Sequence, residues 1–160
     1  MLDQKEHPVM ILIPGNEVTD REGDKDYSEI GKYKVEQQGE NVAILALGDF
    51  YQRGEQLSAK IKAELGFTPT LINPRFASGI DKELLESLSE RHQMVITMED
   101  GILSGGFGEK IASFYGSSDM KVKNYGLEKK FYDRYDPNEL LKEVGMTPAQ
   151  IIADICNQIK

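Results

Sequence analysis

The chain has 160 residues, a length that suits one domain with a sizeable core. Its 27 acidic residues outnumber 19 basic ones and give a formal charge of -8, so we expect neither nucleic acid nor a membrane surface as a partner. The single cysteine, Cys156, precludes an internal disulfide. No secretory leader and no bilayer-length apolar run is visible, which predicts a cytoplasmic protein.

The first predicted element is a buried strand. Residues 9–13 are continuously apolar and are followed by Pro14 and Gly15, as expected where a strand ends in a turn. Residues 16–30 are polar and rich in Asp, Glu and Gly, a composition that buries little surface. We therefore expect a linker over residues 16–30, and we expect the opening strand to belong to a sheet that lies mostly outside this chain.

Strands and helices alternate after the linker. In chain order, the predicted elements are a hairpin over 32–37 and 41–47, a helix over 51–65 ending at Gly66, a strand over 68–72, a helix capped by Asp81, a strand over 94–98, a helix through Ile111 and Phe114, a strand over 120–125, and two helices that begin at Asp136 and Thr147. Such alternation favours parallel pairing through right-handed crossovers. The predicted fold class is α/β: a three-layer, open, mostly parallel sheet with one antiparallel edge strand, contributed by the hairpin, and helices on both faces.

The best candidate site lies where the predicted strand over 94–98 ends. Glu99 and Asp100 end that strand, and Gly105, Gly106 and Gly108 begin the next helix. Open α/β sheets place ligands at the carboxyl ends of strands, and a helix N-terminus offers free N–H groups to anions. However, the Lys-Ser/Thr ending of a phosphate loop is missing, and two carboxylates would repel a phosphate. Three roles stay open: close packing at the glycines, the edge of a ligand site, or catalytic carboxylates.

Other polar side chains give weaker signals. Arg75 follows another predicted strand end and is either a residue of the same site or a solvated, ion-paired arginine. His92 is expected at a helix C-terminus, where partial positive charge is favourable, and His7 receives no role. Cys156 flanks the apolar stripe of the last helix and is expected as a small residue of the core or its boundary; a reactive thiol is the alternative, and no neighbouring cation supports it. Two histidines and one cysteine do not suffice for a typical zinc site.

A succession of short motifs resembles the C-terminal third of the 1-deoxy-D-xylulose-5-phosphate synthases, within the transketolase-like superfamily. In chain order, the motifs are Pro8 to Gly15, Val42 to Gly48, Pro74 to Phe76, Ile80-Asp81, Met94 to Asp100, Ser104 to Gly108, Asn124 to Leu127, Glu139 to Leu141 and Val144 to Met146. Each motif is weak alone, but their order and spacing agree over nearly the whole chain.

The resemblance implies a division of the chain. Residues 1–15 would close a preceding pyrimidine-binding domain, residues 16–30 would form a linker, and residues 31–160 would form a transketolase-like C-terminal domain. Enzymes of this family hold thiamine diphosphate and Mg in two other domains and condense pyruvate with glyceraldehyde 3-phosphate. The implied partners are those upstream thiamine-binding domains of the same enzyme, in a homodimer.

For this chain alone, the resemblance implies no catalytic, cofactor-binding or metal-binding residue and no activity. The residues expected at the active-site rim or at a domain interface are Arg75, Glu99, Asp100, Gly105, Gly106 and Gly108. Two departures concern the substrate: Leu12 and Gly15 stand where the family commonly carries arginines suited to a phosphate. At the edge of the domain, Glu128 and Lys129 replace the usual Pro-Asp pair. The alternative function is a stand-alone module for small-ligand binding or subunit assembly.

Overall fold

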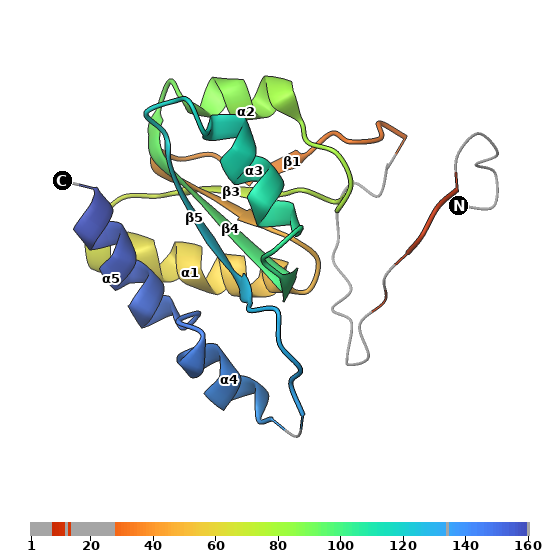
Figure 1. Cartoon of the computed structure of the whole chain (residues 1–160). Coiled ribbons are helices and arrows are strands. Elements are labelled where there is room, and N and C mark those ends of the chain that lie inside the picture. Colours follow the sequence, from red (N-terminus) through yellow and green to blue (C-terminus); the bar gives the residue numbers. More distant parts are fainter. Residues whose placement is uncertain (1–7, 12, 14–27, 134, 160) are drawn as a thin grey trace.

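A computed structural model describes residues 8–11, 13, 28–133 and 135–159, and its strands form one sheet in the order β1-β3-β2-β4-β5 (Figure 1). The elements are β1 (Lys34–Gln37), β2 (Asn41–Ala46), α1 (Phe50–Leu65), β3 (Thr70–Asn73), α2 (Lys82–Leu88), β4 (His92–Ile102), α3 (Phe107–Tyr115), β5 (Lys121–Leu127), α4 (Pro137–Glu143) and α5 (Pro148–Gln158). Strands β3, β2, β4 and β5 pair in parallel, whereas β1 pairs with β3 in the antiparallel sense.

The sheet lies between two helical layers. Helices α1 and α5 cover one face, where Ile44 and Leu57 are fully buried, and α2 and α3 cover the other, where Leu45 and Leu85 are fully buried. Strand β2 lies in the middle of the sheet and supplies alternate residues to both cores, which is why its sequence is apolar throughout. The predicted fold class is confirmed. None of the described helices is long and apolar enough to cross a membrane.

The antiparallel edge strand has a different partner from the one predicted. Strand β1 pairs with β3 and not with β2, because residues 38–40 carry the chain across the amino end of β3. The crossing is tight: the N–H of Gly39 donates to Thr70 Oγ1 at 2.9 Å, and a Cβ at Gly39 would lie 2.1 Å from the Thr68 carbonyl oxygen. The prediction of an antiparallel edge strand is confirmed, and the prediction of a hairpin is wrong.

Local signals place the helix boundaries well. Asp81 accepts a hydrogen bond from the N–H of Leu84 at 3.3 Å, as an N-cap should. Thr147 and Gln150 form the reciprocal bonds of a capping box at the start of α5. Helix α1 ends at Gly66, whose φ of +79° is the left-handed conformation that glycine adopts readily. These predicted boundaries are confirmed.

The apolar run before the domain forms no strand in the described residues. Val9, Met10, Ile11 and Ile13 are each at least half exposed and have no regular secondary structure. The run pairs with neither β1 nor β5, the two edge strands of this sheet, and its predicted place in a sheet outside this chain stays a prediction. Leu12, Gly15 and most of the predicted linker lie outside the described residues.

Cys156 is exposed, although it follows a buried residue of α5. Ile151, Ile152 and Ile155 point into the core, as the predicted stripe requires. One residue beyond Ile155 is a rotation of about 100° around the helix, and this turns the Cys156 side chain toward solvent. The predicted position at the core boundary is wrong.

His92 is buried at the start of β4, just beyond the end of α2. Its Nδ1 donates to the carbonyl of Leu88, in the last turn of α2, at 2.9 Å. Nε2 therefore accepts from the Thr70 hydroxyl, which lies 2.8 Å away. Burial lowers the pKa of His92, and nearby Arg91 acts in the same direction. The predicted location beside a helix C-terminus is confirmed in substance, since the ring bonds to the last carbonyl of α2 although His92 itself begins β4.

Candidate functional site

The predicted site residues all lie at or just beyond the carboxyl ends of the parallel strands. Arg75 follows β3, Glu99 and Asp100 are near the end of β4, and Gly105, Gly106 and Gly108 lie at the start of α3. The connection from β2 leads to β3 on one side of the sheet, and the connection from β4 leads to β5 on the other side. The direction of the connections therefore reverses between β2 and β4. Open sheets form ligand crevices at such a point. Strand β2 separates Arg75 from Glu99.

Glu99 is a structural residue at the start of α3. It is only 5% exposed, and its Oε2 accepts a hydrogen bond from the N–H of Phe107 at 2.9 Å. Its Oε1 accepts from the N–H of Gly108 at 2.8 Å. The carboxylate thus satisfies two of the free N–H groups of the helix and lies at the positive end of the helix dipole. Glu99 occupies the position that the loop would otherwise offer to an anion.

Gly106 and Gly108 allow α3 to approach the sheet closely. A Cβ at Gly106 would lie 2.7 Å from Glu99 Oε2, and a Cβ at Gly108 would lie 2.5 Å from Thr97 Oγ1. Both distances are shorter than real Cβ contacts. Beneath Gly108, the Thr97 hydroxyl donates to Asn124 Oδ1 at 2.8 Å and links β4 to β5. This geometry supports the close-packing role of the two glycines, and the rim or interface role predicted for Glu99, Gly106 and Gly108 stays a prediction.

Asp100 and Gly105 lie on the surface of the same cluster. The φ of Gly105 is +77°, a conformation that favours glycine, and its N–H donates to the carboxylate of Glu109. Asp100 presents an exposed carboxylate at the sheet edge. A role at the rim of a site or at a domain interface stays a prediction for both residues.

Arg75 has an unusual backbone conformation directly after β3. Its φ of +62° is rare for a residue with a side chain. Asn73 Oδ1 supports the turn by accepting the Arg75 N–H at 3.0 Å, and the residue is half-buried. Such strain occurs often at functional sites and interfaces. The rim or interface role predicted for Arg75 stays a prediction.

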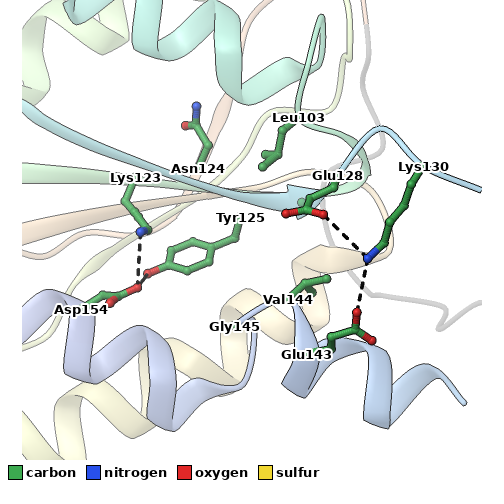
Figure 2. A pocket seen from close by; sticks show the side chains of 11 residues that line it. Leu103, Lys123, Asn124, Tyr125, Glu128, Lys130, Glu143, Val144, Gly145 and Asp154 are labelled. Atoms are coloured by element: carbon green, nitrogen blue, oxygen red, sulfur yellow. Dashed lines mark hydrogen bonds and ion pairs between the residues drawn. The ribbon is translucent and has the colours of Figure 1, made fainter. Parts of the chain in front are cut away.

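A cavity of about 350 Å³ lies beside β5, where no site was predicted from the sequence (Figure 2). The hydroxyl of Tyr125 donates to Asp154 Oδ2 at 2.8 Å, and Lys123 Nζ lies 3.7 Å from the same oxygen. Burial raises the pKa of Tyr125, and the bond to Asp154 adds to the effect. This end of the cavity is a network of three mutually satisfied polar groups.

The other end of the cavity is also lined by paired charges. Lys130 Nζ lies 3.3 Å from a carboxylate oxygen of Glu143 and 3.7 Å from one of Glu128 (Figure 2). The lining has two lysines, Lys123 and Lys130, and three carboxylates, so the cavity carries a small net negative charge and each lysine is already paired. Its walls come from β5, α4, α5 and the loops beside them, so no local motif indicates it. The sequence signal for this cavity was that Lys123 and Tyr125 are two residues apart in a predicted strand, so that their side chains lie on the same face of the sheet.

The described residues contain no group of three or more His, Cys, Asp or Glu side chains arranged to hold a metal ion. The start of α3 does not fit a diphosphate group. Two of its N–H groups are bound to Glu99, and the carboxylate would repel a second anion there. The side chains at the carboxyl ends of the strands are therefore better suited to packing α3 against the sheet than to binding a diphosphate.

Residues 31–151 match the family model of the transketolase C-terminal domain. The 1-deoxy-D-xylulose-5-phosphate synthase of Shouchella clausii is 34% identical over 148 residues, which are 90% of this chain and 23% of that protein. An enzyme of the same name from Prochlorococcus marinus is 32% identical over 144 residues, which are 89% of this chain and 22% of that protein. The chain spans less than a quarter of the length of these curated relatives.

Solved structures agree with the fold. A structure described as "Split gene transketolase, inactive beta4 tetramer" matches with a TM-score of 0.72 at 24% identity, covering 82% of this chain and 43% of that chain. A 2-oxoglutarate:ferredoxin oxidoreductase from Magnetococcus marinus matches with a TM-score of 0.52 at 17% identity, covering 81% and 20%. The predicted resemblance to the C-terminal domain of the synthases is confirmed. Because the family model covers most of the described sheet and helices, the chain belongs to the transketolase C-terminal domain family.

Proposed function

We propose that this chain is the C-terminal, non-catalytic domain of a thiamine-diphosphate-dependent synthase, supporting domain packing and dimer assembly. The observation that carries the proposal is the pattern of coverage. Nine-tenths of the chain aligns with 1-deoxy-D-xylulose-5-phosphate synthase, yet it accounts for less than a quarter of that protein. This coverage supports our inference that the cofactor chemistry lies in the part of the relative's length outside the match.

The geometry at the carboxyl end of β4 and the start of α3 supports a structural role for Glu99 and the neighbouring glycines. The buried carboxylate there, Glu99, is committed to two N–H groups of α3. The glycines of the loop serve close packing of that helix. A catalytic carboxylate needs access to a substrate, and the bonds of Glu99 to backbone do not provide it.

For the parent enzyme, we propose the reaction of the named relatives, condensation of pyruvate with glyceraldehyde 3-phosphate to give 1-deoxy-D-xylulose 5-phosphate, an isoprenoid and thiamine precursor. Thiamine diphosphate and Mg would be held by the upstream domains, and the enzyme would work in the cytoplasm as a homodimer. Leu12 and Gly15, where the family commonly has arginines, leave room for a different acceptor sugar. One structural neighbour is described as a split-gene transketolase, which supports the idea that such a domain can form a separate subunit.

Calorimetry tests the proposal and separates it from the alternative, a stand-alone ligand-binding module. The purified chain is titrated with thiamine diphosphate and Mg, pyruvate, sugar phosphates and nucleotides. We expect no tight binding to the chain alone, and we expect the upstream thiamine-binding polypeptide to bind the cofactor. Tight binding of thiamine diphosphate to the chain alone would contradict a non-catalytic role.

The cavity beside β5 is the observation that favours the alternative. Its volume of about 350 Å³ is at the lower end of the range for small-molecule sites. Saturable binding of a sugar phosphate or nucleotide, abolished by Lys123→Ala, would support the module and count against the leading proposal. The matched control is Lys60→Ala, which removes a lysine from a surface ion pair on α1.

A further inference from the structure

The three-residue crossing between β1 and β2 is held partly through a side chain that can titrate. Residues 38–40 pass over the amino end of β3, where the N–H of Gly39 donates to Thr70 Oγ1 at 2.9 Å. Thr70 Oγ1 in turn lies 2.8 Å from Nε2 of His92, and Nδ1 of His92 lies 2.9 Å from the carbonyl oxygen of Leu88. These contacts form one continuous chain of hydrogen bonds from the crossing to the end of α2.

Each hydrogen bond in this chain has a fixed direction. The Gly39 N–H can only donate and the Leu88 carbonyl can only accept, so Nδ1 of His92 carries a proton. In the neutral ring Nε2 is then an acceptor, and the Thr70 hydroxyl donates to it. Thr70 is fully buried and His92 is 6% exposed, so both depend on these partners. The chain of bonds is complete only while His92 is neutral.

A second proton on His92 breaks this arrangement. Nε2 becomes a donor that points at Thr70 Oγ1, which already accepts the Gly39 N–H. The hydrogen of the Thr70 hydroxyl then loses its acceptor, since the hydroxyl bonds to these two residues alone within the described part of the chain. A buried hydroxyl without an acceptor costs free energy, and so does a buried positive charge. Protonation therefore favours an open crossing that admits water.

The charged groups around His92 do not remove this cost. Glu40, in the crossing, raises the pKa of His92, as does the hydrogen bond to the end of α2, whereas Arg91 lowers it. Burial has the largest effect and also lowers the pKa. Strands β2 and β3 face the ring with the neutral residues Asn41 and Thr70. The closed crossing thus holds the neutral ring, and opening restores the ordinary pKa.

Strand β1 is the element that such an opening releases most easily. It has four residues, lies at the edge of the sheet, and within the described sheet it pairs with β3 alone. Its pairing is interrupted by a register shift between Val35 and Gln37. At the end of the crossing Asn41 has a φ of +65°, which is uncommon for a residue with a side chain. A short edge strand beside such a turn opens more readily than central strands do.

We infer that the hydrogen-bond chain from Gly39 through Thr70 to His92 is an acid-sensitive switch, in which protonation of His92 opens the crossing and releases β1 while the other strands stay paired. The release leaves the edge of β3 without a partner. The inference is independent of the proposed function, because it depends only on the fold of this domain.

Amide hydrogen exchange of the full chain, followed by NMR at pH 7.5 and at pH 5.0, tests the inference. Protection factors, which correct for the intrinsic pH dependence of exchange, are compared between two groups of amides. We expect the protection of Gly39 and β1 to fall about 5- to 30-fold at pH 5.0, the upper value being set by a released histidine with a pKa of about 6.5. The amides between β4 and β5 should remain at least about a hundredfold more protected than those of β1.

Two charge-removing variants distinguish a switch from a merely structural contact. Glu40→Gln should move the midpoint of the loss of protection to lower pH, because Glu40 favours the charged ring, and Arg91→Gln should move it to higher pH. In His92→Gln the protection of Gly39 and β1 should not fall between the two pH values. The inference is overturned if the unchanged chain keeps this protection at pH 5.0, if all strands lose protection together, or if His92→Gln and both charge variants leave the fall unchanged.

Discussion

The N–H of Gly108 donates to Glu99 Oε1 at 2.8 Å, and this bond ties the start of α3 to the end of β4. The same carboxylate accepts the N–H of Phe107, so one buried side chain caps the helix from a neighbouring strand. The loop between them needs glycine at position 106, where a Cβ would collide with the carboxylate. The motif Glu-Asp-Gly followed by Ser-Gly-Gly-Phe-Gly is thus a device for helix docking.

Glu99→Gln should destabilise the domain by about 1–3 kcal/mol, because the amide offers one acceptor to two N–H donors and faces one of them with its NH₂ group. Equilibrium urea unfolding followed by circular dichroism measures the change. The control is Asp100→Asn on the exposed neighbour, which should change the free energy of unfolding by less than about 0.5 kcal/mol. Equal stability of both variants would contradict the capping role.

Gly108→Ala should destabilise the domain by about 1–3 kcal/mol, because the added methyl group would push against Thr97 Oγ1 and Asn124. Gly116→Ala is the matched control at the other end of α3, where a Cβ would lie 3.4 Å from its nearest neighbour, the Ser113 carbonyl oxygen. Urea unfolding should show a clear loss for the first variant and little change for the second. A tolerated Gly108→Ala would mean that α3 does not need its close approach to the sheet.

Tyr33→Phe should leave the stability unchanged or raise it. The Tyr33 hydroxyl is buried without a well-formed hydrogen bond in the part of the chain that the structure describes, and burial raises the pKa of Tyr33 to about 12 although the nearby Asp81 backbone acts in the opposite direction. Removing an unsatisfied hydroxyl removes a desolvation cost. Tyr115→Phe is the control: its hydroxyl donates to the Leu85 carbonyl at 2.5 Å, so its loss should cost about 1 kcal/mol. Thermal unfolding that ranks the two variants in the opposite order would refute this assignment.

Stability should fall as the pH falls below about 6.5, with His92 as one cause. Burial lowers the pKa of His92 in the folded state, so between the folded and unfolded pKa values the unfolded chain binds more protons. The contribution is present above pH 6.5 and is lost as the pH falls toward the folded pKa. The hydrogen bond to Leu88 and the charge of Glu40 raise the pKa of His92 and Arg91 lowers it, but burial has the largest effect.

The measurement is the free energy of unfolding at pH 7.5 and at pH 5.5 for the unchanged chain and for His92→Gln. The variant should lose less stability over this interval, because glutamine does not titrate. Direct NMR titration of the His92 ring should give a pKa below 6.5. A His92 pKa above that value would contradict the neutral hydrogen-bonded arrangement with Thr70 and Leu88.

Local sequence signals predicted most of the fold. The apolar run of β2, the caps at Asp81 and Thr147, and the glycine end of α1 are each determined by neighbouring residues, and all of them are correct. The partner of β1 was not predictable in this way. A three-residue link between two strands normally forms a hairpin. Here β3, which follows later in the chain, lies between β1 and β2, so the link passes across the amino end of β3 instead.

The candidate site shows the same division. The sequence placed Glu99 and the glycines together at a strand end, but the direction of the carboxylate, toward α3 and away from solvent, depends on the packing of that helix. The cavity beside β5 joins residues of β5 to Asp154 on α5, and no spacing rule links positions so far apart.

The most direct test of the account is a recombination assay for synthase activity. Purified chain, purified thiamine-binding polypeptide and their mixture are each supplied with thiamine diphosphate, Mg, pyruvate and glyceraldehyde 3-phosphate, and the condensation product is measured. We expect product from the mixture and none from this chain alone. Turnover by this chain without its partner would contradict the account.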